Sequence, residues 1–251
     1  MVWQILHYQS GVEFTDEAWN AHKKVNEIFA DAIADAVSDG DSVWVHDYHL
    51  FLFPRYLRER LNKKGKRCPI GFTLHTPFPA KDFWRIFAVS RELLEGVVAS
   101  DVVGFHTDEY KLNFVDSCVG LLGAEVTGED IQYQDHNTHT RKFIVGVEPQ
   151  KFADCLLDQH VQRRIEELED IHKRKTVILG VDRLDMTKGL VQKFEGYDLF
   201  LKQHPELKGK VTLLQVVVPS RETVKEYAQL KRELDALVGE IIGRHGTSSL
   251  I

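Results

Sequence analysis

Cysteine is scarce in this sequence, and the few cysteines are far apart. Cys68, Cys118 and Cys155 are the only three among 251 residues, and no two of them form a CxxC pair. A disulfide framework or a thiolate zinc site needs paired or closely spaced cysteines. The sequence therefore argues against a disulfide-stapled secreted scaffold and favours a cytoplasmic protein.

Long hydrophobic runs and an excess of positive charge are also missing. No apolar run approaches the roughly 18 to 20 residues that span a bilayer, and the start, MVWQILHYQSG, lacks the basic segment of a signal peptide. The 38 acidic and 32 basic residues give a net charge of −6, which is no basis for a polyanion-binding surface. We expect a protein that binds neither membrane nor nucleic acid.

What the sequence does contain is an alternation of helical and strand patterns. Val25, Ile28, Phe29, Ile33 and Val37 recur at helical spacing, and SDGD then breaks the pattern before the short apolar run SVWVH. The same alternation predicts helices over 23–37, 50–61, 81–100 and 107–123, and strands over 42–46, 69–75 and 101–106. Thr107 is the expected cap of the last of these helices and Gly123 its expected stop. Strands that are apolar on both faces and joined by helices predict a parallel sheet covered on both sides.

The pattern changes after residue 123 and then resumes. Residues 124–147 alternate like a hairpin with 135–139 as its loop, and GVEPQKF opens a new segment. The second part reads as a helix over 156–175, strands over 176–181 and 211–218, and helices over 189–205 and 221–241. The first of these helices carries one apolar stripe, formed by Leu157, Val161, Ile165 and Leu168. The fold class is therefore α/β, with two Rossmann-like domains over 1–147 and 148–251.

Polar residues follow five of the predicted strands. They are His46-Asp47-Tyr48-His49, His75-Thr76-Pro77, His106-Thr107, Asp182-Arg183-Leu184-Asp185 and Pro219-Ser220-Arg221. Ligands of open parallel sheets bind beyond the carboxyl ends of the strands. Any one of these groups alone would more often be a helix cap or a loop, but five together indicate a binding site.

Two interpretations compete for the first of these groups. His46 and His49 invite a metal site, but a spacing of three across a strand-to-helix junction does not place both imidazoles on one face. Asp47 either caps the following helix, or accepts hydrogen bonds from substrate hydroxyls or takes a proton.

The stretch VDRLDMTKGL predicts a diphosphate site. Arg183 and Lys188 follow a buried strand and precede a helix that Gly189 helps to start, so two cations and free backbone N–H groups converge. The alternative is a surface pair between Arg183 and a neighbouring aspartate. Arg221 follows the helix cap Ser220, and its guanidinium can donate two parallel hydrogen bonds to a phosphate. Neither GxGxxG nor GxxxxGK[ST] occurs, so no dinucleotide fingerprint or P-loop supplies the phosphate signal.

Six motifs together resemble one known family. In order, VWVHDYHL, IGFTLHTPFP, DVVGFHT, GVEPQKF, ILGVDRLDMTKG and VPSRETVKEY are similar to the motifs of the trehalose-6-phosphate synthase family of retaining glycosyltransferases. The resemblance covers essentially the whole chain. It implies a GT-B fold, in which two Rossmann-like domains face each other across a cleft, and transfer of glucose from UDP-glucose to glucose 6-phosphate, giving α,α-trehalose 6-phosphate and UDP.

The resemblance also implies roles for six residues. Arg183 and Lys188 would bind the donor diphosphate, and His75 would lie beside the transferred glucose. Asp47, Trp3 and Arg221 would bind the acceptor. The family reacts on one face of the donor, so cations that stabilise the leaving group replace a general acid and base. This implies no cofactor and no bound divalent metal.

Both ends depart from the family pattern. Family members begin earlier, with a Gly-rich loop and an Arg, and continue past GRHGT into an acidic segment. We therefore expect a central fragment that is incomplete in both domains and not a full catalyst alone. The alternatives are a non-catalytic regulatory or sugar-phosphate-sensing subunit, and a GT-B transferase with another acceptor, although Arg221 favours a phosphorylated one. A homo-oligomer and a trehalose synthase complex both stay open.

Overall fold

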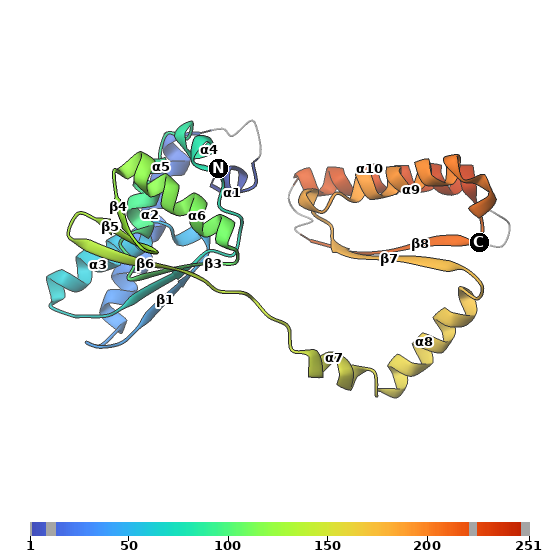
Figure 1. Ribbon diagram of the computed structural model, residues 1–251, viewed down its shortest axis with the longest axis horizontal. Helices are drawn as coiled ribbons and strands as arrows, with labels where there is room; N and C mark the ends of the chain where they lie inside the picture. The colour runs from blue at the N-terminus through green and yellow to red at the C-terminus, as the bar shows by residue number, and fades with distance from the viewer. Residues whose placement is uncertain (1, 9–13, 221–224, 247–251) are drawn as a thin grey trace. The chain divides into compact units, whose positions relative to one another are not determined.

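The chain forms two compact units, residues 1–147 and 148–251. The structure, a computed structural model, describes residues 2–8, 14–220 and 225–246 (Figure 1). None of the helices in these ranges is both long and apolar enough to cross a membrane.

The first unit is built on a six-stranded mixed sheet. Its strands are β1 (Val43–His46), β2 (Ile70–Thr73), β3 (Val102–Phe105), β4 (Glu125–Thr127), β5 (Asp130–Tyr133) and β6 (His136–Lys142). The strand order is β1-β2-β3-β6-β5-β4. The first four strands in that order run parallel, and β5 and β4 continue the sheet in antiparallel pairs.

Helices alternate with these strands along the chain. They are α1 (Val2–Leu6), α2 (Asp16–Ala36), α3 (Phe53–Lys64), α4 (Lys81–Arg85), α5 (Ser90–Val97) and α6 (Asp108–Ser117), with a 3₁₀ turn at Tyr48–Leu50 and a π-helical turn at Cys118–Leu122. Thr107 caps α6 as predicted, because its hydroxyl accepts the Tyr110 N–H at 3.2 Å. Gly123, at φ 74°, ends the π-helical turn where the sequence predicted a stop.

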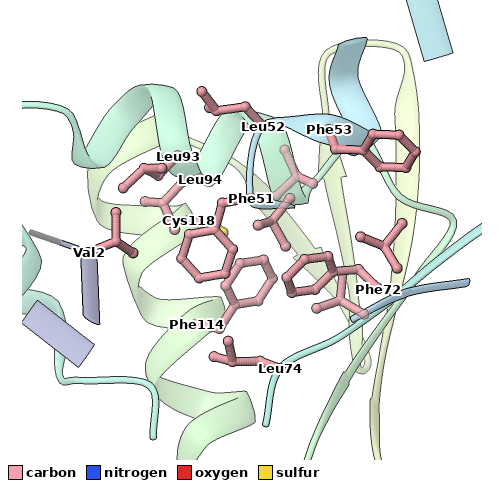
Figure 2. Close-up of a cluster of buried hydrophobic side chains, with 14 of the residues drawn as sticks. Val2, Phe51, Leu52, Phe53, Phe72, Leu74, Leu93, Leu94, Phe114 and Cys118 are labelled. Carbon is pink, nitrogen blue, oxygen red and sulfur yellow. The ribbon is translucent and has the colours of Figure 1, made fainter. Parts of the chain in front are cut away.

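The core of the first unit lies between this sheet and its helices. Figure 2 shows part of it, including the rings of Phe51, Phe72 and Phe114, each no more than 1% exposed. On the opposite face of β1, Trp44 is 68% exposed. The prediction of a sheet covered on both sides is therefore wrong for the described residues.

Two predicted elements of the first unit are also wrong. The helix predicted over 81–100 is interrupted between α4 and α5, where Phe87 N–H and Ser90 N–H close successive turns. The loop predicted over 135–139 is largely strand β6. The turn is tighter because Gln134 takes a left-handed conformation with φ 53°, and β6 pairs with β3 as well as with β5.

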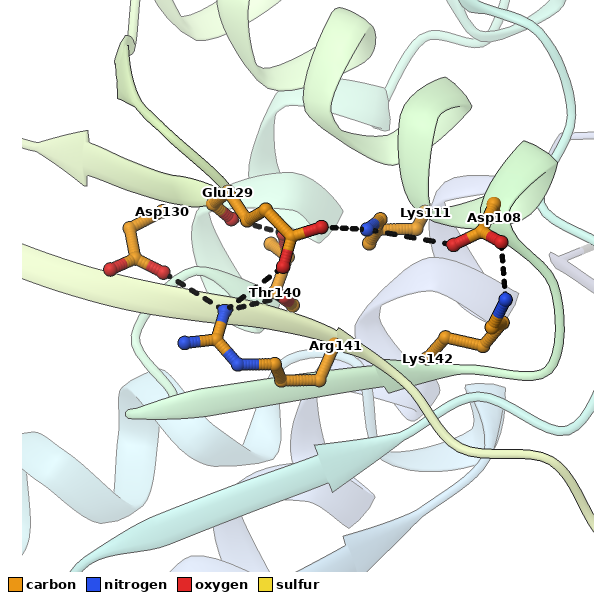
Figure 3. A network of polar contacts seen from close by, with 7 residues as sticks. All are labelled: Asp108, Lys111, Glu129, Asp130, Thr140, Arg141 and Lys142. Carbon is orange, nitrogen blue, oxygen red and sulfur yellow. Dashed lines mark hydrogen bonds and ion pairs between the residues drawn. The ribbon is translucent and has the colours of Figure 1, made fainter.

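An ionic network ties β6 and the β4–β5 turn to helix α6 (Figure 3). Lys111 binds Glu129 at 2.5 Å and lies 3.6 Å from Asp108, which also pairs with Lys142. Arg141 contacts Asp130 at 3.1 Å. The hydrogen bond from Lys111 holds the pKa of Glu129 below its usual value.

The second unit has a much smaller sheet. It contains α7 (Pro149–Cys155), α8 (Gln159–Ile171), β7 (Thr176–Arg183), α9 (Leu190–Gln203), β8 (Val211–Val218) and α10 (Lys225–His245), with 3₁₀ turns at Met186–Lys188 and Pro205–Leu207. Strands β7 and β8 pair in parallel along their whole length. Helices α9 and α10 cover one face (Figure 1), while Leu179 and Val181 of β7 are 64% and 62% exposed.

Few side chains of the second unit are deeply buried. Its apolar cluster consists of Leu184, Leu190, Leu230 and Leu234. Helices α7 and α8 contribute no buried residue, so the apolar stripe predicted along α8 is not packed into a core. Leu157, the first residue of that stripe, is 81% exposed.

Charged contacts join α9 to α10. Asp198 of α9 accepts hydrogen bonds from Lys202 at 2.5 Å, Arg244 at 2.9 Å and His245 at 2.7 Å. The bond from Lys202, followed by that from His245, lowers the pKa of Asp198 to about 2. This carboxylate is the main polar link between the two helices.

Candidate functional site

Three histidines meet at the carboxyl ends of β1, β2 and β3. The Nδ1 of His46 lies 3.0 Å from Nε2 of His75, and the Nδ1 of His75 lies 3.2 Å from Nε2 of His106. The strands that carry them are neighbours in the sheet and run parallel, which brings their ends to one edge. His46 and His75 are exposed and His106 is half-buried.

Asp47 stands beside this row with a strained backbone. Its φ of 71° and ψ of 170° fall in a region that is essentially restricted to glycine. The Asp47 N–H donates to the Thr73 carbonyl at 2.9 Å, and the His75 N–H approaches the Asp47 carboxylate at 3.4 Å. Asp47 makes no side-chain cap to the 3₁₀ turn that follows, so the capping interpretation is wrong. Strain of this kind is typical of functional positions.

His49 does not join His46. The His49 ring packs on Tyr48, with ring centroids 4.1 Å apart, and its carbonyl accepts from Asn26 at 3.1 Å. Within 2–8, 14–220 and 225–246, no group of three or more His, Cys, Asp or Glu side chains could hold a metal ion.

Helix α1 places Trp3 in the first unit. Val2, Ile5 and Leu6 are buried and anchor the helix, while Trp3 is half-buried and stacks on His7 with centroids 4.3 Å apart. The Tyr8 hydroxyl accepts the Ala80 N–H at 3.0 Å, which ties the end of the helix to the segment after β2. A partly exposed indole on an anchored helix is able to stack on a sugar.

Two cations lie at the end of strand β7 and just after it in the second unit. The Arg183 side chain is 58% exposed, and its nearest acid, Asp185, lies 3.8 Å away, beyond hydrogen-bond distance. Asp182 binds Lys193 at 2.5 Å instead. Lys188 has no ion pair among the described residues. The surface-pair alternative for Arg183 thus reduces to one long contact, and both cations are available to a ligand.

Asp185 holds the loop that carries these cations. Its buried carboxylate accepts from the Thr187 N–H at 3.0 Å, the Thr187 hydroxyl at 2.8 Å and the Tyr227 hydroxyl at 3.4 Å. Burial raises the pKa of this carboxyl, but the bonds from Thr187 and the nearby cations outweigh it and hold the pKa below its usual value. Gly189, at φ 61°, then leads into α9. Cations and the N–H groups of a helix N-terminus together suit a diphosphate.

The structure thus brings two of the predicted residues together in each unit. Asp47 and His75 lie together in the first, and Arg183 and Lys188 share a loop in the second. Arg221 lies outside the described residues. Sequence reasoning did not assign roles to His106 and Asp185. Both follow predicted strands, and that position was the signal that could have identified them.

The chain is similar to known proteins over its full length. Residues 1–250 match glycosyltransferase family 20. One relative, the Alpha,alpha-trehalose-phosphate synthase (UDP-forming) of Emericella nidulans, is 44% identical over 248 residues, which are 98% of this chain and 49% of the relative. The chain spans about half the length of the curated relatives it matches.

Solved structures show the same fold. "Trehalose-6-phosphate from E. coli bound with UDP-2-fluoro glucose" is 30% identical with a TM-score of 0.91, and 99% of this chain covers 54% of that one. An alpha,alpha-trehalose-phosphate synthase (UDP-forming) from Burkholderia xenovorans in complex with glucose-6-phosphate is 27% identical, with a TM-score of 0.88. The match covers 99% of this chain and 56% of that one. The N-terminal domain of a Candida albicans trehalose-6-phosphate phosphatase is 28% identical, with a TM-score of 0.88 and coverage of 99% and 52%. The predicted fold class, α/β of the GT-B type, is confirmed.

Proposed function

This chain belongs to glycosyltransferase family 20, and from that premise we propose that it acts in the transfer of glucose from UDP-glucose to glucose 6-phosphate. The products are α,α-trehalose 6-phosphate and UDP, with retention at the anomeric carbon. The observation that carries the proposal is the loop with two available cations after β7, in a chain 44% identical to a synthase whose name includes "UDP-forming".

The proposed roles divide between the two units. Arg183 and Lys188 hold the donor diphosphate, and His75 lies beside the transferred glucose. Asp47, Trp3 and Arg221 hold the acceptor. The half-buried indole of Trp3 and the strained backbone of Asp47 support the acceptor assignment. The first unit is accordingly proposed as the acceptor side and the second as the nucleotide-sugar side.

The proposed reaction takes place on one face of the donor. The bond from C1 of glucose to the β-phosphate oxygen breaks, and a bond from C1 to the acceptor's hydroxyl oxygen forms. The hydroxyl proton passes to the leaving phosphate oxygen. Arg183 and Lys188 stabilise the negative charge that develops there, which is the transition-state contribution that a positioned cation makes best.

The test is UDP affinity, measured by isothermal titration. Arg183→Ala and Lys188→Ala should each weaken UDP binding by roughly 10- to 150-fold, because a charge-assisted contact contributes about 1.5 to 3 kcal/mol. Lys208→Ala is the matched control. It removes the same charge from the same unit, but near the start of β8, at the other end of the sheet. Equal losses in all three variants, or no UDP binding at all, would refute the assignment.

A second candidate is a regulatory or sensing subunit that binds the sugar phosphates without turnover. The observation that favours it is the likeness to the N-terminal domain of a trehalose-6-phosphate phosphatase, a protein named for a different activity. Assaying UDP release with both substrates, after binding of each has been measured, separates the candidates. Binding without release supports the second one.

The setting of the protein is proposed more generally. We place it in the cytoplasm, where sugar nucleotides are available, and we propose self-association or membership of a trehalose synthase complex. Light scattering of the purified protein, alone and with its copurifying partners, tests the second point.

A further inference from the structure

The three imidazoles after β1, β2 and β3 are joined head to tail. In both contacts, Nδ1 of one ring meets Nε2 of the next, from His46 to His75 and from His75 to His106. A neutral imidazole has one N–H donor and one acceptor nitrogen. Because His75 uses both of its nitrogens, it must donate to one neighbour and accept from the other.

This arrangement couples the tautomers of the three rings. If His46 donates from Nδ1, Nε2 of His75 accepts, so His75 carries its proton on Nδ1 and donates it to Nε2 of His106. The proton of His106 then also lies on Nδ1. If His106 donates from Nε2 instead, all three protons lie on Nε2. The neutral chain therefore has two fully hydrogen-bonded states, and in each of them all three rings are the same tautomer.

The two ends of the chain are not equally fixed. His106 follows β3, which is paired with β2 on one edge and β6 on the other, and the next residue caps α6. His46 ends β1, which has one paired edge among the described residues, and precedes the strained Asp47. A ring held by a rigid neighbour keeps its orientation, so His106 is the anchored partner of His75.

We propose that His106 is a positioning residue for His75. The His106 ring keeps its hydrogen bond to Nδ1 of His75, so Nε2 of His75 is the nitrogen that changes partner. A hydroxyl of the donor glucose binds this Nε2 in place of His46. The inference rests on the proposed function, in which His75 lies beside the transferred glucose. When the sugar replaces His46, His75 keeps two partners and its ring does not turn.

The coupling itself is tested by nuclear magnetic resonance on protein with ¹⁵N-labelled histidine. Ring ¹⁵N shifts separate protonated from unprotonated nitrogens, so they report the tautomer of each neutral ring. We expect His46, His75 and His106 to show the same tautomer. In His106→Ala the tautomer ratio of His75 should change, because Nδ1 of His75 loses its partner. A wild-type protein in which His75 and His106 are different tautomers would overturn the proposal.

The positioning role is tested by three variants, two of which have effects of opposite expected sign. His106→Ala should weaken UDP-glucose binding by about 2- to 12-fold, the equivalent of one hydrogen bond, and leave binding of UDP unchanged. His106→Gln should restore most of the loss, because an amide both donates and accepts. His46→Ala should strengthen UDP-glucose binding by a similar factor, because the sugar no longer displaces a ring.

Two binding results would contradict the positioning role. One is His106→Ala binding UDP-glucose as tightly as the unaltered protein, and the other is His46→Ala losing affinity as His106→Ala does. If the unaltered protein binds no UDP-glucose, the proposed function fails on its own. The tautomer measurement still decides whether the histidine chain exists.

Discussion

The two units share an α/β design but hold themselves together by different means. The first buries a cluster of 31 hydrophobic residues between its sheet and its helices, whereas the corresponding cluster of the second has four leucines. The second unit adds the charged contacts of Asp198 and the polar cage around Asp185. The histidine row and Asp47 are therefore carried by a tightly packed scaffold, while the loop with Lys188 depends on the polar contacts of Asp185.

The largest expected effect is in the aromatic core of the first unit. The Phe114 side chain is fully buried, and its ring lies 5.3 Å from Phe78 and 5.2 Å from Phe105 between centroids. Phe114→Ala should lower the free energy of unfolding of this unit by about 3 to 5 kcal/mol. Urea unfolding followed by tryptophan fluorescence measures it selectively, because all four tryptophans lie within residues 3–84.

Leu234→Ala is the counterpart in the second unit. Leu234 belongs to the four-leucine cluster, and its truncation should cost about 2 kcal/mol, the low end for leucine, because so few neighbours lose contacts. Hydrogen exchange of the β7 and β8 amides follows this unit. Equal losses of unfolding free energy in Phe114→Ala and Leu234→Ala would contradict the difference in packing between the two units.

A pair of glycine substitutions sharpens the contrast by its sign. A Cβ on Gly96 of α5 would lie 2.2 Å from the Phe51 carbonyl oxygen, whereas a Cβ on Gly239 of α10 would meet nothing within 4 Å. Gly96→Ala should therefore destabilise the first unit by about 1 to 3 kcal/mol, and Gly239→Ala should stabilise the second by up to about 1 kcal/mol. Tryptophan fluorescence during urea unfolding measures the first variant, and hydrogen exchange of the β7 and β8 amides measures the second. A stabilising Gly96→Ala would contradict the close approach of the Phe51 backbone.

A smaller effect is expected at Asp47, where stability and function should move in opposite directions. Glycine adopts its backbone angles without strain, so Asp47→Gly should stabilise the first unit by about 1 kcal/mol after the entropy cost of glycine. Glucose 6-phosphate binding should be lost. Asp47→Ala is the matched control, because it removes the carboxylate but keeps the strain. If the glycine variant is no more stable than the alanine variant, the strain is not real.

The smallest effect is the acid sensitivity of the second unit. Because the pKa of Asp198 is lowered to about 2 in the folded chain, its stabilisation is complete above the ordinary carboxyl value of about 4. That stabilisation is lost as the pH falls from there through about 2. Urea unfolding followed by circular dichroism gives the free energy of unfolding of the unaltered protein and of Asp198→Asn. The difference between these two free energies should shrink as the pH falls across this window. A difference that stays constant would exclude Asp198 as the titrating group.

Much of the fold followed from local patterns. Periodicity identified the strands that became β1, β2, β3, β7 and β8, and Thr107 was recognised as a cap because its hydroxyl precedes an apolar helical run. The break at 86–89 was not predictable, because Ile86 and Phe87 continue the helical pattern although Ile86 is 76% exposed. The first part of β6 was read as a loop because its residues are polar, whereas its strand identity comes from pairing with distant β3.

The site was predictable in part for the same reason. Residues after strands could be picked out one by one, which gave Asp47, His75 and Arg183. Their contacts could not, because these depend on strand order and register, which carry no local signal. The row from His46 to His106 exists only because β1, β2 and β3 are neighbours in the sheet. The left-handed backbone of Asp47 is a tertiary constraint on a residue type that tolerates it poorly.

The position of β6 has a consequence for the order of synthesis on the ribosome. It is the last strand of the first unit, yet it lies in the middle of the sheet, between β3 and β5. A nascent chain that has reached Tyr133 holds a parallel piece, β1 to β3, and a hairpin, β4 and β5, with no strand to join them. The sheet is completed only when β6, which ends at Lys142, can pair with both β3 and β5.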